Sequence, residues 1–190
     1  MLLKTLVEYC APTLAGLKTG NIFTIKNGLY DIDEEICSLN TILVERGLRL
    51  VPLRKKKESI MIYLYRPERL KEDLKDPAAV KILKDKGYHF RDPDCCIAEL
   101  ARHLKSDPVF PHEIGLFLGY PPYDVKKFME DPFRGVKCVG CWKAYGDECE
   151  AKKTFDKYKK CTAIYSKQIE CGRPLEALIV NPRRQVRLCS

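Results

Sequence analysis

Three separated stretches of the sequence hold cysteine or histidine in settings that favour chemistry, and the first runs from Cys10 to Lys18 (CAPTLAGLK). Because Pro12 pushes the residue before it away from helical angles, we expect a helix over residues 2–9 to stop near Cys10. Backbone N–H groups left free beside such a position lower a thiol pKa and make a better nucleophile, and Lys18 helps if it folds back. The alternative is that Cys10 is a small buried apolar residue.

The second stretch runs from Phe110 to Pro121 (FPHEIGLFLGYP) and places His112 in the first turn of a helix that opens at Pro111. An imidazole there is a candidate base for a cysteine that the fold brings near, as in Cys–His hydrolases. Glu113 points elsewhere on the same helix, so it orients that imidazole poorly. The alternative is a histidine that is simply hydrogen-bonded near a helix start.

The third stretch, Cys138 to Lys143 (CVGCWK), is a C-x-x-C motif with glycine inside it. This spacing presents two thiolates to zinc or iron, and it is also the spacing of a redox dithiol. A zinc ribbon needs a second cysteine pair, and the sequence has none at the right distance. Metal binding, dithiol chemistry and simple packing in a strand over residues 136–145 all stay open.

Residues 111–130 also have the spacing of a helix-turn-helix, with Gly115 at the helix crossing, Gly119 at the turn and Val125 as an anchor. The net charge of +8 makes DNA binding worth considering. Against it, the second helix offers two cations and turns two acidic residues toward the phosphates, namely Lys126, Lys127, Asp124 and Glu130.

The composition indicates a folded chain of one domain. Of its 190 residues, 45% are apolar and 32% charged, which excludes an intrinsically disordered chain. No apolar run approaches the ~18 residues of a membrane span, so we expect no membrane partner. Because Lys4 and Glu8 interrupt the apolar N-terminal segment, the sequence does not predict a signal peptide there. We therefore expect a cytoplasmic protein whose ten cysteines are reduced.

The pattern of apolar residues, caps and turns predicts an α+β fold, in which a small, mostly antiparallel sheet packs against several helices. We expect a single domain over residues 1–180 and a basic, flexible tail over residues 181–190. Residues 59–65 are apolar on both faces, which predicts a strand covered on both sides. The expected elements are a strand at 21–26, a helix capped by Asp31, a hairpin of 48–53 and 59–65, helices opening at Pro67, Pro77, Pro93, Pro111 and Pro121, and a long helix over 147–171.

The stretches CAPTLAGLK, HEIGLFLGYP and CVGCWKAYGD together resemble an uncharacterised family of chains of about this length, found mostly in clostridia and related anaerobic Firmicutes. The resemblance covers nearly the whole chain, to about Val180. It implies no assigned reaction. It does imply a cytoplasmic bacterial protein in which Cys10, His112 and the Cys138/Cys141 pair recur as a set. It also implies redox or metal handling, with a redox partner such as flavodoxin.

Our hypothesis is a thiol-centred protein in which the three stretches converge on one pocket. Cys10 is the activated thiol and His112 its proton partner, in redox or in Cys–His hydrolase or transferase chemistry, while Cys138 and Cys141 form a resolving dithiol or a soft-metal clip. The remaining residues expected to line the pocket are Lys18, Glu113, Tyr120, Trp142 and Lys143.

Two alternatives belong to other functional classes. In the first, the protein holds zinc or iron without turnover, through Cys138, Cys141 and His112. In the second, it is a DNA-binding or adaptor protein that works through residues 111–130. Nucleic acid is disfavoured as a partner but stays open.

Overall fold

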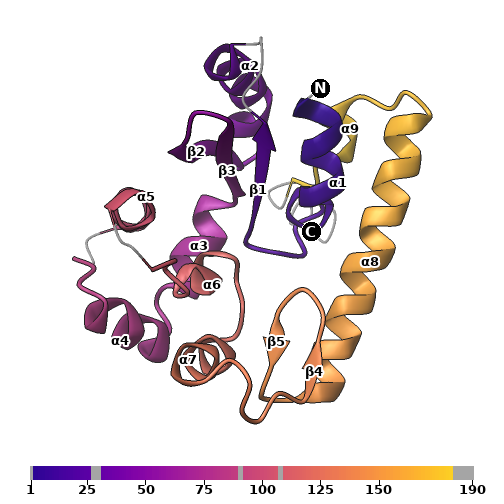
Figure 1. The fold of residues 1–190 in the computed structure, drawn as a ribbon. Helices are drawn as coiled ribbons and strands as arrows, with labels where there is room; N and C mark the ends of the chain where they lie inside the picture. Colours follow the sequence, from indigo (N-terminus) through magenta and orange to yellow (C-terminus); the bar gives the residue numbers. More distant parts are fainter. Residues whose placement is uncertain (1, 27–30, 90–91, 107–108, 182–190) are drawn as a thin grey trace, which may run out of the picture. The chain divides into compact units, whose positions relative to one another are not determined.

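The computed structural model describes residues 2–26, 31–89, 92–106 and 109–181, and its elements confirm the α+β class (Figure 1). The chain divides into two compact units, which we describe separately. Unit 1 is Met1–Pro67 with Tyr158–Ser190, and unit 2 is Glu68–Lys157. The extent of a single domain over residues 1–180 stays a prediction. Apart from Asn181, the predicted tail lies outside the described residues.

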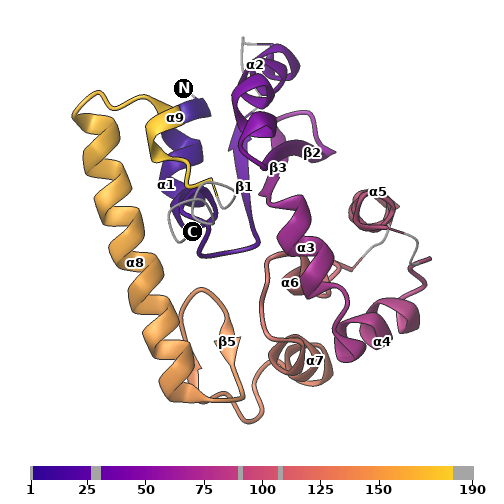
Figure 2. The ribbon, with the colours of Figure 1, turned by 180° about the vertical axis from the view of Figure 1, so that it is seen from behind.

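Unit 1 is built on an antiparallel sheet with the strand order β1-β3-β2. Helix α1 packs on β1, and α2 packs on β2. In Figures 1 and 2, α9 lies beside α1. The elements of unit 1 are α1 (Leu2–Leu14), β1 (Gly20–Lys26), α2 (Ile32–Glu45), β2 (Arg49–Lys55), β3 (Ser59–Tyr65), the part of α8 (Glu148–Glu170) from Tyr158 onward, and α9 (Leu175–Leu178).

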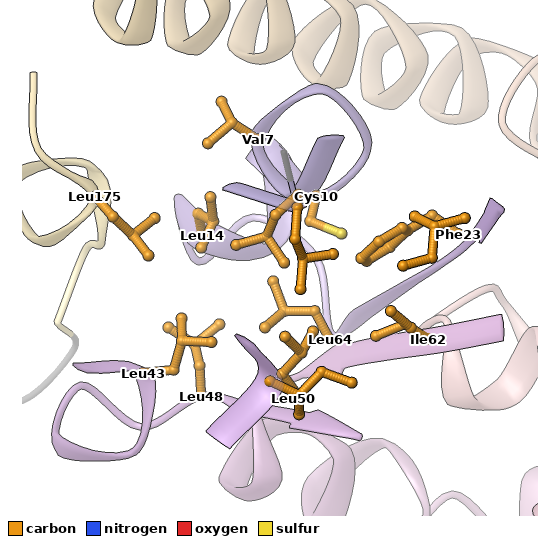
Figure 3. Close-up of a cluster of buried hydrophobic side chains, with 14 of the residues drawn as sticks. Val7, Cys10, Leu14, Phe23, Leu43, Leu48, Leu50, Ile62, Leu64 and Leu175 are labelled. Carbon is orange, nitrogen blue, oxygen red and sulfur yellow. The ribbon is translucent and has the colours of Figure 1, made fainter. Parts of the chain in front are cut away.

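Strand β3 is buried on both of its faces, as the sequence predicts. Ile60, Ile62 and Leu64 join a cluster of apolar side chains from α1, β1, α2, β2 and α9 (Figure 3). On the other face, Tyr63 and Tyr65 are buried and stack with their ring centroids 4.9 Å apart. A strand buried on both sides is a strong source of hydrophobic stabilisation, so β3 is the centre of unit 1.

The capping signals of the sequence operate as expected. Asp31 Oδ1 accepts hydrogen bonds from the backbone N–H groups of Asp33 and Glu34, which begins α2. Asp76 caps α4 (Pro77–Asp85) in the same way. Local signals of this kind need no long-range contact, and they fix where these helices begin.

The first helix differs from its prediction, because α1 continues through Pro12 to Leu14. Proline has no N–H to donate to the carbonyl four residues earlier in the helix, and its ring crowds that carbonyl. Burial of Ala11 and Leu14 offsets that cost. Cys10 therefore lies inside the helix and not at its end, so the structural premise for an activated thiol at a helix end is wrong.

Arg66 holds the C-terminal end of α1 in place. Its Nε donates to the carbonyl of Thr13 (2.7 Å), and its Nη2 donates to the carbonyls of Leu14 (2.7 Å) and Val180 (2.9 Å). The backbone N–H of Val180 donates to the same Leu14 carbonyl. One guanidinium at 5% exposure thus joins the end of α1, the end of β3 and the C-terminal segment. A cation also suits the negative end of the helix dipole.

Unit 2 is mainly helical and carries a short two-stranded hairpin. In both views, β5 lies between α7 and the first turns of α8 (Figures 1 and 2). Its elements are most of α3 (Pro67–Asp73), then α4, α5 (Pro93–Ser106), α6 (Ile114–Phe117), α7 (Pro122–Glu130), β4 (Cys138–Val139), β5 (Lys143–Ala144) and the first turns of α8. No helix in the described part of the chain is long and apolar enough to cross a membrane.

The single strand predicted over residues 136–145 is wrong, because the chain reverses at Gly140 to form the β4–β5 hairpin. Cys138 pairs with Ala144, and Val139 pairs with Lys143. A Cβ at Gly140 would collide with the ring of Phe155 on α8, so the turn needs glycine to fit. Cys138 and Cys141 therefore lie on a strand and on the turn that follows it.

We predict that replacing Arg66 by methionine lowers the free energy of unfolding by about 3 kcal/mol, since three carbonyl groups lose a charged donor. Urea unfolding followed by circular dichroism measures the change. Arg173→Met is the matched control, because Arg173 is exposed in the same unit; we expect a change within about 0.5 kcal/mol. Equal stability of the two variants would contradict the role given to Arg66.

Candidate functional site

Unit 2 contains a cavity of about 290 Å³ that brings together two of the stretches singled out by the sequence. His112 and Tyr120 line it from the segment around α6, and Cys141, Trp142 and Lys143 line it from the hairpin. The apolar walls are Ile114, Val125, Phe128 and Val139, with Gly115 and Gly140 between them. Concave, largely apolar sites with a few polar groups are where small ligands bind.

The carboxylate of Asp124, on α7, fixes the hairpin against this cavity. Its Oδ2 accepts from the indole Nε1 of Trp142 (2.8 Å), and its Oδ1 accepts from the backbone N–H groups of Tyr145 and Gly146 (2.9 Å each). Asp124 is 4% exposed. Three donors around one buried carboxylate compensate its loss of water, so the arrangement holds Trp142 in one orientation.

Aromatic rings form the wall of the cavity. Trp142 stacks on Tyr120 with ring centroids 5.1 Å apart, and its ring meets Phe155 edge to face at 4.5 Å. The hydroxyl of Tyr120 donates to the carbonyl of Cys141 (2.9 Å). Each contact adds to the apolar area that Trp142 buries, and together they position the turn that carries Cys141.

The polar groups of the cavity are held by aromatic neighbours. The ring of His112 meets Phe128 edge to face, 5.0 Å between centroids. The ammonium of Lys143 lies 4.5 Å from the ring centroid of Phe133 and donates to the carbonyl of Pro132 (2.9 Å). An imidazole, an amine and a thiol therefore line one largely apolar cavity.

A protein-family model described as "Protein of unknown function (DUF3793)" matches residues 6–179. The chain belongs to this family. The match confirms the predicted membership of an uncharacterised family and assigns no reaction. No curated protein and no solved structure matches the chain.

In this DUF3793 chain, Cys10 lies in unit 1, away from any surface. It is 0% exposed, and its sulfur points among the carbon side chains of the apolar cluster (Figure 3). Burial raises the pKa of the Cys10 thiol, and the smaller opposing influence is the charge of Lys18, which is itself buried. His112 lies in unit 2. The pairing of Cys10 with His112 stays a prediction.

The free N–H groups expected beside Cys10 are engaged in the turn that follows α1. Ala15 donates to the carbonyl of Ala11, and Gly16 donates to that of Thr13. Leu17 and Lys18 both donate to the carbonyl of Pro12. These groups stabilise the turn, and the backbone contribution to thiol activation that the sequence suggested has no support here.

A metal at Cys138 and Cys141 also stays a prediction. Across residues 2–26, 31–89, 92–106 and 109–181, no three His, Cys, Asp or Glu side chains form a group that could hold a metal ion. Structural zinc takes four ligands. Zinc or iron at this pair would need ligands from beyond the described residues.

Helix α6 begins at Ile114, so the prediction that His112 lies in the first turn of a helix opening at Pro111 is wrong, and His112 lies in the turn before α6. Two local features expected from the helix-turn-helix spacing are present. A Cβ at Gly115 would lie 2.8 Å from Val125 Cγ2, and Gly119 turns the chain at φ +74°. The lysines of α7 nevertheless pair with Glu130, at 3.7 Å from Lys126 and 2.8 Å from Lys127. Unit 2 also has as many acidic as basic residues, so the net charge of +8 belongs to unit 1. DNA binding through residues 111–130 stays a prediction that these charges do not favour.

Sequence reasoning missed a buried polar network around Glu113, which was expected only to line a pocket near His112. Glu113 Oε1 accepts from the hydroxyl of Tyr88 (3.1 Å) and faces His103 Nδ1 (3.5 Å). Burial, and then the charge of Glu113, raise the pKa of Tyr88, so its phenol remains a donor. No local motif marks His103 or Tyr88. An acidic residue in an otherwise apolar helical segment was the available signal.

We predict that Asp124→Asn lowers the free energy of unfolding by about 2–3 kcal/mol, because one oxygen is replaced by an amide that cannot accept a hydrogen bond. Trp142 is the only tryptophan of the chain, so its emission reports on this site and should shift to longer wavelength. Asp156→Asn, an exposed position in the same unit, is the control and should change neither value. Unchanged emission in Asp124→Asn would remove Asp124 as the group that orients Trp142.

Proposed function

We propose that unit 2 carries a thiol-bearing binding site for a small ligand with a flat apolar part, with Cys141 as its reactive group and His112 as its proton partner. The observation that supports this is the shared cavity. Residues from the motif around His112 and from the motif around Cys141, which are separated in sequence by helix α7, line the same cavity of about 290 Å³. The convergence of a nucleophile candidate and a base candidate in one cavity is the usual basis for assigning a reactive site.

The shape of the ligand follows from the walls. Trp142, Tyr120 and Phe128 offer aromatic surfaces, and the glycines leave room between them. A flat apolar group gains both burial and stacking in such a site. The ammonium of Lys143 favours an acidic or strongly polarised substituent on the same molecule.

Cys141 suits the reactive role better than Cys10. Cys141 is exposed and lines the cavity, whereas Cys10 is enclosed in the core of unit 1. The thiolate is the nucleophile, and burial in apolar surroundings disfavours it. In this proposal Cys10 is a core residue, and Cys138 is the second thiol of the working pair.

The proposed step is thiol–disulfide exchange. The thiolate of Cys141 attacks one sulfur of a disulfide ligand, the ligand S–S bond breaks, and the departing thiolate takes a proton from His112. Cys138 then gives its proton to the neutral His112, and its thiolate attacks the mixed disulfide. The second ligand thiolate leaves, takes that proton from His112, and a Cys138–Cys141 disulfide remains. The ligand gains two electrons and the dithiol loses two. A redox partner of the cell restores the dithiol, which fits the expected cytoplasmic location.

The first test uses dithiobis(nitrobenzoate), an aromatic disulfide with carboxylates, on the reduced full chain. We expect the rate of Cys141 modification to saturate with reagent concentration, because the reagent binds the cavity before it reacts. Cys149 is exposed in the same unit and should react in proportion to concentration. Mass spectrometry of the modified peptides assigns each phase.

Two variants separate binding from thiol reactivity. Phe128→Ala should raise the reagent concentration that gives half-maximal rate about fivefold, because stacking and burial are lost. Cys141→Ser should abolish the saturating phase. Cys149→Ser is the matched control and should retain it. If Cys141 reacts linearly and no faster than Cys149, the cavity does not recruit the reagent and the proposal fails.

A second test addresses the metal-binding alternative. Because the dithiol proposal needs both thiols free, we expect protein purified without oxygen to contain no zinc or iron near one equivalent. Elemental analysis measures this, with Cys138→Ser as the comparison. One equivalent of metal that is lost in Cys138→Ser would replace the dithiol by a metal centre.

A further inference from the structure

A second cavity of unit 2, of about 420 Å³, has a buried carboxylate in its wall. Val109, Phe110 and Met129 supply its apolar lining, and Lys86 lines it from an exposed position. His112 lines both this cavity and the aromatic one. Glu113, 3% exposed, and His103, 7% exposed, are its buried ionisable groups.

The donors around Glu113 are arranged on one of its two oxygens. Arg102 Nη2 donates to His103 Nε2 at 2.9 Å, and a guanidinium is only a donor. His103 therefore carries its hydrogen on Nδ1, which faces Glu113 Oε1 at 3.5 Å. The hydroxyl of Tyr88 donates to the same Oε1.

The other oxygen, Oε2, has no hydrogen-bond donor among the described residues, and it is not a fully buried atom. Burying a carboxylate is costly unless its acceptor sites are used. Because Glu113 lines the cavity and one of its oxygens is left without a donor, the carboxylate presents an acceptor for a donor from outside the chain.

We propose that this cavity binds the primary ammonium group of a small apolar amine, with Glu113 Oε2 as the acceptor. An ammonium supplies the hydrogen and the positive charge that the carboxylate lacks, and such charge-assisted bonds are the stronger class. Phe110, Val109 and Met129 line the same cavity and supply apolar surface for the body of the amine, and an aromatic ring also attracts a cation.

The alternative of an anionic ligand is less compatible with the same residues. Both ring nitrogens of His103 are engaged, one by Arg102 and one by Glu113. The buried charge that an anion would meet is negative. Lys86, which lines the cavity, and Arg102, which donates to His103, are nearby positive charges, but both are exposed, so water and salt screen them.

The experiment compares phenethylammonium with phenethyl alcohol, its neutral counterpart, in an NMR titration of the isotope-labelled full chain. We expect saturable shifts of the amides of Val109, Phe110 and Met129 with the amine, and about tenfold or more weaker binding of the alcohol. Glu113→Gln keeps an acceptor for Tyr88 but loses the charge, and should weaken the amine about tenfold or more. Glu99→Gln is the control, since Glu99 pairs with the exposed His89, and should bind the amine like the wild type.

Equal affinity for the amine and the alcohol would overturn the proposal, as would an unchanged amine affinity in Glu113→Gln or shifts that do not saturate. The wild-type comparison decides the question even if Glu113→Gln does not fold. Cys141→Ser should bind the amine normally, so this site and the thiol site succeed or fail independently.

Discussion

The aromatic cavity of unit 2 depends on one buried carboxylate. Among the described residues that line this cavity, Asp124 has the only acidic side chain, and it joins α7 to the hairpin through the Trp142 indole and two backbone N–H groups. The hairpin has only two residues in each strand, too few to fix its own position. The orientation of Trp142, and with it the turn that carries Cys141, therefore follows from an electrostatic contact more than from strand pairing.

The parts of this molecule that sequence reasoning predicted are those that short-range rules decide. Asp31 caps a helix because its carboxylate reaches N–H groups two and three residues away, and Gly115 admits Val125 across a single turn. The reversal at Gly140 was missed because the reason for it, the ring of Phe155, lies on another element. Continuation of α1 past Pro12 likewise depends on burial that no local pattern shows.

The candidate site shows the same division. The types of residue were predictable, and His112, Tyr120, Trp142 and Lys143 do line one cavity. Which cysteine serves that cavity was not predictable, because exposure separates Cys141 from Cys10 and exposure is a tertiary property. The distribution of charge between the two units was likewise not predictable from the net charge of the chain. The overall value of +8 suggested a polyanion partner for residues 111–130, yet the unit that contains them is balanced.

Two buried acidic residues of unit 2 show how structural and binding roles differ. Asp124 receives donors on both oxygens, so its burial is compensated within the chain. Glu113 receives its donors on one oxygen, and the other remains without a donor among the described residues. Asp124 and Glu113 are equally buried, but the free-energy cost of burial is greater for Glu113. That cost depends on how many acceptor sites of the carboxylate are left unused. Since the Glu113 side chain is held by Tyr88 and His103 and does not turn to satisfy both oxygens, the remaining site is available to a ligand that brings its own donor.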